Sequence, residues 1–130
     1  MPEIDYNLRD NLVTFYKMNT QAFAELNEFV TNRDKRITAN FLSKLFSSNN
    51  SFYVNDININ VEFGKKRRIF GKANFDTCVR GRNTNRICII NGNTKLYTTY
   101  CQLNFFKWLY ENNLHKWMIE EYSSIIEKIN

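Results

Sequence analysis

The apolar residues of this chain repeat with the period of a helix near both ends and with the period of a strand in the middle. Over residues 5–31 they recur every three or four positions, which predicts one long amphipathic helix with Asp5 as its N-cap. A shorter helix is expected over residues 38–46. From Ile57 to Phe63 apolar and polar residues alternate, which predicts a half-buried strand. Helices and strands that are segregated along a chain indicate an α+β fold.

A β-hairpin is expected in the second half of the chain. Residues 86–90 are rich in isoleucine and read as a strand, and residues 95–98 read as the returning strand. The Asn91-Gly92 pair between them is typical of a type I′ turn, in which both central residues have positive φ.

Two helices are expected to follow the hairpin. Thr99 and Gln102 have the spacing of a capping box, so a helix should begin at Thr99 and run to about Glu111, with enough large apolar side chains to form the central core helix. Asn112-Asn113 should end it, because asparagine tolerates the left-handed conformation, and a last helix is expected over residues 114–129. The predicted architecture is an N-terminal helix pair, a small antiparallel sheet of hairpins, and two C-terminal helices packed on the sheet.

The length and composition favour a single domain that spans residues 1–130. The chain is 43% hydrophobic and 15% aromatic, which is sufficient for one packed core. Its N-terminus has no signal-peptide pattern and no apolar run approaches about 18 residues, so no membrane association is expected. The three cysteines, an odd number without secretory context, indicate reduced thiols inside a cell.

Positive charge is concentrated between residues 65 and 86. This window holds eight bases and one acid, Asp76, for a net charge of +7, whereas the whole chain has 18 bases, 13 acids and a net charge of +5. The remaining ten bases and twelve acids therefore sum to −2. The bases of the window are Lys65, Lys66, Arg67, Arg68, Lys72, Arg80, Arg82 and Arg86. Gly64 and Gly71 bracket the first four, which suggests a hairpin tip or a charged edge strand.

A segment of this kind attracts polyanions and releases their condensed counterions on contact. The leading interpretation is a non-enzymatic protein that binds DNA or RNA through a basic hairpin region, mainly by electrostatics and with weak sequence selectivity. The eight bases would contact phosphates, and Phe70 is the expected stacking side chain, with Phe63 and Phe75 as further candidates.

Two other interpretations of the same charge remain open. The bases could form a solvated sheet edge that blocks edge-to-edge pairing. They could also dock an acidic protein surface, which would make the chain a structural or protein-interaction module, such as a minor virion component or a host-interaction factor. The long N-terminal helix could then be shared across a homodimer.

The residues for catalysis or metal binding do not form a recognisable pattern. Asp56, Glu62 and Lys65 could serve a metal-dependent nuclease, but their spacing departs from the common arrangement of acid, one spacer and lysine. Cys78, Cys88, Cys101 and His115 could supply four zinc ligands, but they lack the close pairs of structural zinc sites. No catalytic residue, metal or cofactor is therefore predicted.

His115 is the only histidine, and it is expected either on the surface or at the start of a helix. A cysteine–histidine nucleophile with this residue has no local sequence signature. The last two expected helices also resemble a helix-turn-helix in outline. The segment that would read DNA offers only His115 and Lys116 near its start, so core packing is the preferred interpretation.

The run Thr98-Thr99-Tyr100-Cys101-Gln102-Leu103-Asn104-Phe105-Phe106-Lys107-Trp108, followed by Glu111-Asn112-Asn113-Leu114, resembles a segment of small, uncharacterised proteins of nucleocytoplasmic large DNA viruses. In those proteins a basic, aromatic stretch and a hairpin precede a "TT-x-x-Q-L-N-F-F-x-W" pattern. The resemblance covers the last third to half of the chain, and the abundance of asparagine, with 20 residues, is consistent with it. It implies a viral protein made in an infected cell, in the host cytoplasm or nucleus, and packaged in a virion in some cases. It carries no catalytic residues.

Overall fold

The computed structural model describes residues 5–31, 42, 44–46, 53–54, 56–75 and 85–120. In chain order its elements are α1 (Tyr6–Met18), α2 (Thr20–Thr31), β1 (Tyr53–Val54), β2 (Ile57–Asn58), α4 (Ile59–Phe70), α5 (Lys72–Phe75), β3 (Arg86–Asn91), β4 (Thr94–Thr99), α6 (Tyr100–Glu111) and α7 (Leu114–Glu120). Of the helix expected over residues 38–46, the described residues 42 and 44–46 are helical, and the others lie outside the described part.

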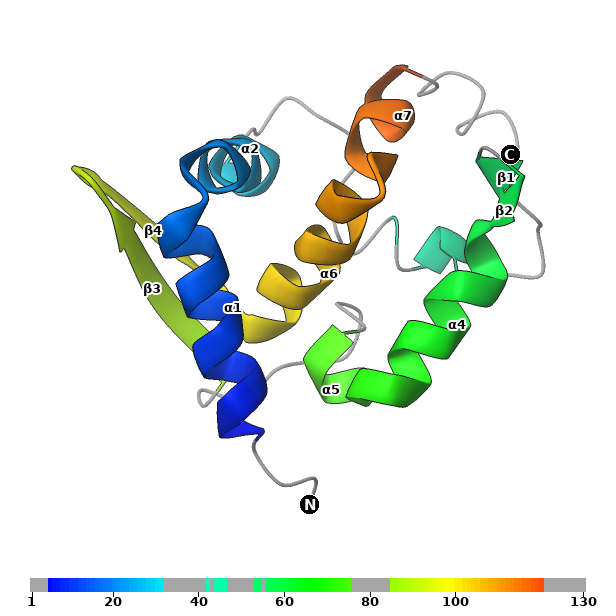
Figure 1. The fold of residues 1–130 in the computed structure, drawn as a ribbon, viewed down its shortest axis with the longest axis horizontal. Helices are drawn as coiled ribbons and strands as arrows, with labels where there is room; N and C mark the ends of the chain where they lie inside the picture. Colours follow the sequence, from blue (N-terminus) through cyan, green and yellow to red (C-terminus); the bar gives the residue numbers. More distant parts are fainter. Residues whose placement is uncertain are drawn as a thin grey trace.

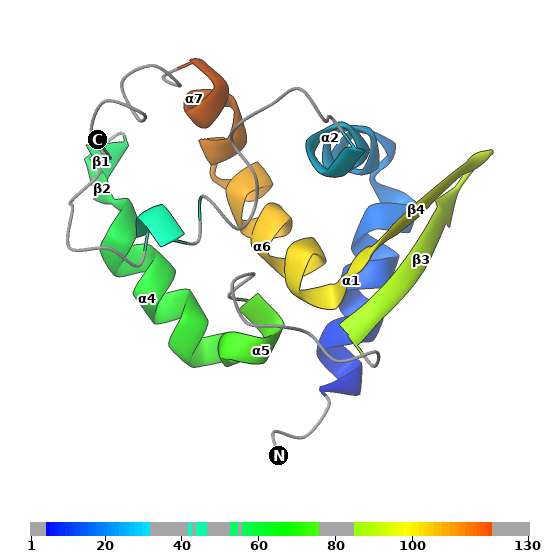
Figure 2. The same cartoon turned by 180° about the vertical axis from the view of Figure 1, so that it is seen from behind.

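The predicted α+β class is confirmed, with packed helices and two antiparallel sheets of two strands each. Helix α6 runs through the middle of the molecule (Figure 1). Helices α1 and α2 and the β3–β4 hairpin lie on one side of it, and α4 and α5 lie on the other. The view from behind shows the hairpin along the outer side of α1 (Figure 2).

The first 27 described residues form two helices, so the prediction of one continuous helix is wrong at Asn19. Asn19 has φ −120° and ψ 84°, and its Nδ2 donates to the Phe15 carbonyl at 2.7 Å, which caps the end of α1. Its own carbonyl accepts from the Phe23 amide at 3.0 Å and begins α2. The chain turns there, so α2 is seen nearly end-on in Figure 1 while α1 lies across the view. The predicted N-cap is confirmed, because Asp5 Oδ1 accepts from the Leu8 amide at 3.0 Å.

The strand predicted from Ile57 to Phe63 is wrong beyond Asn58, because α4 begins at Ile59. A strand would bury Ile57, Ile59, Val61 and Phe63 on one face. Ile59 and Phe63 are instead 1% exposed, whereas Ile57 and Val61 are 42% and 49% exposed. Burial at a spacing of four is the pattern of a helix, and Asn58 starts this helix by accepting from the Val61 amide at 3.3 Å.

The β3–β4 hairpin is confirmed, and its register runs from Arg86 opposite Thr99 to Asn91 opposite Thr94. Its turn differs from the prediction by one residue and in type. The central residues are Gly92 and Asn93, and only Gly92 has positive φ, at 62°. A type II′ turn needs positive φ only at its first central position, which suits glycine there.

Helix α6 begins and ends as predicted. Thr99 Oγ1 accepts from the Gln102 amide at 3.1 Å, and the helix ends at Asn112, after which Asn113 has φ 56°. The Gln102 side chain does not complete the capping box, because its Oε1 accepts from the Thr98 hydroxyl at 2.5 Å. Seven residues of α6 are buried, so its role as the core helix is confirmed. The last helix is described to Glu120, and the remainder of that prediction lies outside the described residues.

An aromatic cluster joins α4 and α5 to α6. The Phe75 ring centroid lies 5.4 Å from that of Phe63, 5.6 Å from that of Phe105 and 5.5 Å from that of Trp108. Phe46 completes the cluster at 5.9 Å from Phe63 and 5.9 Å from Trp108. Four of these five rings are at most 1% exposed, so they form the centre of the core on this side of α6.

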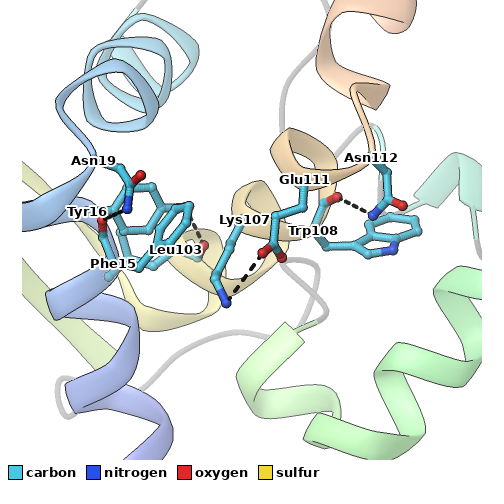
Figure 3. A network of polar contacts seen from close by, with 8 residues as sticks. All are labelled: Phe15, Tyr16, Asn19, Leu103, Lys107, Trp108, Glu111 and Asn112. Atoms are coloured by element: carbon cyan, nitrogen blue, oxygen red, sulfur yellow. Dashed lines mark hydrogen bonds and ion pairs between the residues drawn. The ribbon is translucent and has the colours of Figure 1, made fainter.

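On the other side of α6 the main link is Tyr16, which is fully buried (Figure 3). Its hydroxyl donates to the Leu103 carbonyl at 2.6 Å. Burial, and secondarily the negative charge of Glu111, raise the pKa of Tyr16 well above its ordinary value. Lys107 lies nearby, 3.8 Å from the Glu111 carboxylate and 5.1 Å from the Phe15 ring centroid.

Replacement of Ile59 and of Ile57 by alanine distinguishes the helix from the predicted strand. Ile59→Ala should lower the free energy of unfolding by about 2–5 kcal/mol, because it leaves a cavity in the core. Ile57→Ala should cost less than about 1 kcal/mol, because Ile57 is 42% exposed and its truncation leaves no enclosed cavity. Urea denaturation measures both values. Equal losses would indicate that both side chains share one buried face and would contradict the helix.

Replacement of Tyr16 by phenylalanine tests the buried hydroxyl. Near neutral pH, Tyr16→Phe should lower the free energy of unfolding by about 0.5–1.5 kcal/mol through loss of the hydrogen bond to Leu103. The tyrosine of the unfolded chain ionises near pH 10, whereas the raised pKa keeps Tyr16 protonated in the folded state. The unfolded state then binds fewer protons, so wild-type stability falls as the pH rises through this range. The difference between the two proteins should therefore narrow between about pH 9 and pH 11, and a constant difference in urea titrations would contradict the raised pKa.

Candidate nucleic-acid interface

The first four cations of the basic segment lie on α4, so the prediction of a hairpin tip or an edge strand for them is wrong. The charges of α4 follow the helix dipole, with Glu62 in the first turn and Arg67 and Arg68 in the last. The Asn58 cap, the buried spacing of Ile59 and Phe63, and this charge order all favour a helix over a strand.

These four cations surround the C-terminal half of α4 and do not share one face. Consecutive helical residues point about 100° apart. Lys65 and Arg68 are exposed on the outer side, and Lys66 and Arg67 are half-buried at the two borders of the buried side. The Arg67 guanidinium carbon lies 5.7 Å from the Phe63 ring centroid. We name Lys65, Lys66, Arg67 and Arg68 the cationic rim.

Gly71 ends α4 directly after the cationic rim. It has φ 85° and ψ 147°, and its amide donates to the Arg67 carbonyl at 2.9 Å. This conformation lets the chain begin α5 at Lys72 and fold back onto α6, where Asn104 Nδ2 donates to the Asn74 carbonyl at 3.0 Å. Lys72, the first residue of α5, therefore lies close to the cationic rim along the chain.

The basic window of residues 65–86 is attached to the N-terminal half of α6 at two points. In its middle the Asn74 carbonyl accepts from Asn104 Nδ2, and near its end Asn85 Oδ1 accepts from the Cys101 amide at 3.3 Å. Residues 101 and 104 lie one turn apart, so α5 and the start of β3 are brought to neighbouring turns. Arg86, the first residue of β3, is exposed there. Arg80 and Arg82 lie outside the described residues.

The aromatic rings of the basic segment are directed into the core. Phe63 and Phe75 are at most 1% exposed, so the expectation that they stack on bases is wrong. Phe70 is half-buried, and its ring stacks on Phe75 with centroids 5.8 Å apart and planes at 24°. Among the described residues, the strongly exposed aromatic side chains are instead Tyr6, Tyr53 and Tyr97.

Tyr97 is the functional candidate that sequence reasoning missed. It is 75% exposed on β4, between the exposed Lys95 and the half-buried Thr99. The alternation of β4 carries the signal, since Leu96 and Thr98 are buried while Lys95 and Tyr97 are exposed. The sequence alone does not say which of the two faces packs on the body.

The residues considered for other chemistry are dispersed. Cys101 is buried in the first turn of α6, and Cys88 is exposed on β3, both as free thiols. Glu62 forms an exposed ion pair with Lys65 at 3.4 Å, and Asp56 lies in the turn before β2 with φ 68°. The described residues contain no group of three or more His, Cys, Asp or Glu side chains that could hold a metal ion.

Of the two expected positions for His115, the structure shows the helix start, because the residue lies in the first turn of α7 and is buried. Its Nε2 lies 3.3 Å from Glu25 Oε1, and its ring stacks on Tyr110 with centroids 5.4 Å apart. His115 therefore packs α7 against α2 and α6 and is not presented to a DNA groove, as a recognition helix would require.

The fold is thus an α+β arrangement around α6, with a cationic rim at the end of α4 and an exposed aromatic hairpin on the opposite side. A family model matches residues 3–130, and the chain belongs to that family, which is described as a family of unknown function (DUF7197). No curated protein and no solved structure matches the chain. In the described ranges, no helix is both long and apolar enough to cross a membrane.

The two glycines that bracket the cationic rim should respond in opposite ways to alanine. Gly64→Ala lies within α4, where a new Cβ meets no atom within 4 Å, so it should raise the free energy of unfolding by about 0.5–1 kcal/mol. Gly71→Ala should lower it by about 1–3 kcal/mol, because φ at this position is +85°. Thermal and urea denaturation provide the values. Stabilisation by both substitutions would exclude the turn that places the rim.

Proposed function

We propose that this protein binds nucleic acid through the phosphate backbone, with the cationic rim of α4 as its principal contact. The observation that carries the proposal is the net charge of +7 between residues 65 and 86 against −2 in the rest of the chain. Lys65 and Arg68 expose their side chains on the outer side of α4, whose opposite side buries Ile59 and Phe63. A polyanion that contacts them would release condensed counterions, which drives binding.

Structural roles account for only part of this charge. Arg67 and Arg68 complement the helix dipole, and such cations contribute about 0.3–1 kcal/mol each. The exposed pair of Lys65 with Glu62 is worth at most about 1 kcal/mol. Glu62 is the single acid on α4. A phosphate backbone would add counter-charge beside the exposed Lys65 and Arg68.

The geometry of the rim favours binding with weak sequence selectivity. Only Lys65 and Arg68 share the exposed outer side of α4, so the proposal rests on these two cations, and the spread of Lys66 and Arg67 to other directions reduces the number of phosphates that one face can contact. Phosphate contacts position a protein but do not read sequence. We therefore propose that DNA and RNA are both ligands. Lys72 begins α5 directly after the rim, and we propose Lys72, Arg80, Arg82 and Arg86 as further phosphate contacts.

We also propose an intracellular, reducing location. Cys88 and Cys101 are free thiols, and such cysteines persist where glutathione and thioredoxin keep thiols reduced. The infected host cell implied by the sequence resemblance, in its cytoplasm or nucleus, would be such a setting, and packaging in a virion would follow from affinity for the genome.

A specific observation favours a second candidate, an interaction module for an acidic protein. Val61 and Ile69 are 49% and 70% exposed on the same outer side of α4 as Lys65 and Arg68. A protein partner would bury these apolar side chains, whereas phosphates would leave them in water. A second copy of the chain or a virion component could supply such a surface.

The salt dependence of binding tests the leading proposal. Affinity for a random-sequence oligonucleotide, measured by fluorescence anisotropy, should fall about 10³-fold or more from about 50 to about 200 mM salt if six or more phosphates are engaged. The double variant Lys65→Gln/Arg68→Gln should bind more weakly and reduce the slope of log affinity against log salt by about two.

The matched control is Lys17→Gln/Lys116→Gln, which removes the same charge from exposed positions on α1 and α7. An equal change of slope in both double variants would assign the effect to net charge and not to the rim. No binding even in dilute buffer would refute the leading proposal. A stable oligomer in light scattering or an acidic partner that co-purifies would then support the second candidate.

A further inference from the structure

The outer face of the β3–β4 hairpin presents a small ordered array of side chains. The register places three pairs on this face, namely Arg86 with Thr99, Cys88 with Tyr97, and Ile90 with Lys95. The opposite face, with Ile89 and Leu96, is buried against the body of the protein. Arg86, Cys88, Ile90, Lys95 and Tyr97 are all exposed, so no described residue covers the array.

Tyr97 lies at the centre of this array, and the two cations lie at diagonal corners. Arg86 and Lys95 are each two residues from the central pair along their strands, which is about 7 Å in opposite directions. Residue 88, directly opposite Tyr97, is a small cysteine, so a face of the Tyr97 ring has no large neighbour across the strand. Residues 86–99 contain two bases and no acid.

We infer that the outer face of the β3–β4 hairpin is a binding site for single-stranded nucleic acid, in which one base stacks on Tyr97 and the flanking phosphates contact Arg86 and Lys95. Every base has a π face, so stacking on an exposed aromatic ring is tolerant of sequence. Arg86 and Lys95 lie on opposite sides of the ring, where the phosphates of a nucleic-acid backbone that crosses the ring would be.

The arrangement favours a single strand over a duplex. In a duplex both faces of each base are covered by its neighbours, whereas an unstacked base can lie flat on a side chain. It also favours nucleic acid over a protein strand. Strand addition would use the backbone edges of the hairpin and would not require an exposed aromatic ring between two cations. The inference shares its ligand class with the proposed function but concerns a different surface.

The test compares wild type, Tyr97→Leu and Tyr97→Phe on a single-stranded oligonucleotide of about 20 nucleotides and on the duplex of the same sequence. Tyr97→Leu should weaken single-strand binding about tenfold and leave duplex binding within about twofold. Tyr97→Phe keeps the ring and should retain wild-type affinity. Tyr6→Leu, at another exposed tyrosine on α1, serves as the control and should have no effect. Unchanged thermal unfolding would show that the variants are folded.

Photo-crosslinking with an oligonucleotide that carries 5-iodouracil locates the stacked base directly. Peptide mapping should place the crosslink on Tyr97, and Arg86→Gln/Lys95→Gln should reduce its yield. A crosslink elsewhere, an unchanged affinity of Tyr97→Leu, or an equal loss on single strand and duplex would overturn the inference.

The outcomes separate this inference from the proposed function. If Tyr97→Leu binds normally while Lys65→Gln/Arg68→Gln is impaired, only the hairpin site is refuted. The reverse result refutes the cationic rim and supports the hairpin. If wild type binds neither oligonucleotide in dilute buffer, both are refuted.

Discussion

The aromatic cluster between α4, α5 and α6 is the interaction on which the arrangement of the candidate interface depends. Phe63 and Phe75 meet Phe105 and Trp108 with centroids 5.5 to 6.1 Å apart, in tilted and edge-to-face geometries. Each such pair contributes about 0.5–1.5 kcal/mol beyond the burial of its area. Because Phe63 is the inner anchor of α4, the cluster determines which side of that helix is buried. The directions of Lys65 and Arg68 follow from it.

Asparagine side chains supply many of the links around this core. Several of these amides connect segments far apart in sequence. Asn91 Nδ2 donates to the Tyr16 carbonyl at 3.1 Å, and Asn60 Nδ2 donates to the Phe46 carbonyl at 2.9 Å. Other asparagine amides cap helix ends within their own segment, as Asn112 does at the Trp108 carbonyl (Figure 3). A hydrogen bond of this type contributes about 0.5–1.5 kcal/mol net, so together they fix the orientation of the elements.

Local sequence signals correctly predicted those elements whose positions depend only on neighbouring residues. Thr99 and Asn113 define the ends of α6, and the alternation of residues 86–99 defines the hairpin, because caps and period-two patterns are properties of the backbone nearby. From Ile57 to Phe63 the apolar residues fit both a strand and a helix, because a pattern that repeats every two residues also repeats every four. The cap at Asn58 and the aromatic cluster decide for a helix. The aromatic cluster is a tertiary contact between residues far apart in sequence, so a short stretch of sequence does not reveal it.

The same ambiguity between helix and strand explains why the sequence predicted a concentration of positive charge but not which of the cations share one surface. Along a strand consecutive cations alternate between two faces, whereas along a helix they spread around the axis. The secondary structure therefore determines which of the four cations can contact one ligand together. Tyr97 was missed for a related reason, because packing on α1 and α6 selects the buried face of the hairpin. The rim and the hairpin lie on opposite sides of α6 (Figure 1). Arg86 is the first residue of β3 and pairs with Thr99 at the end of the hairpin away from its turn. If both proposals hold, a flexible polymer would contact both surfaces, whereas a compact acidic protein would cover only one of them.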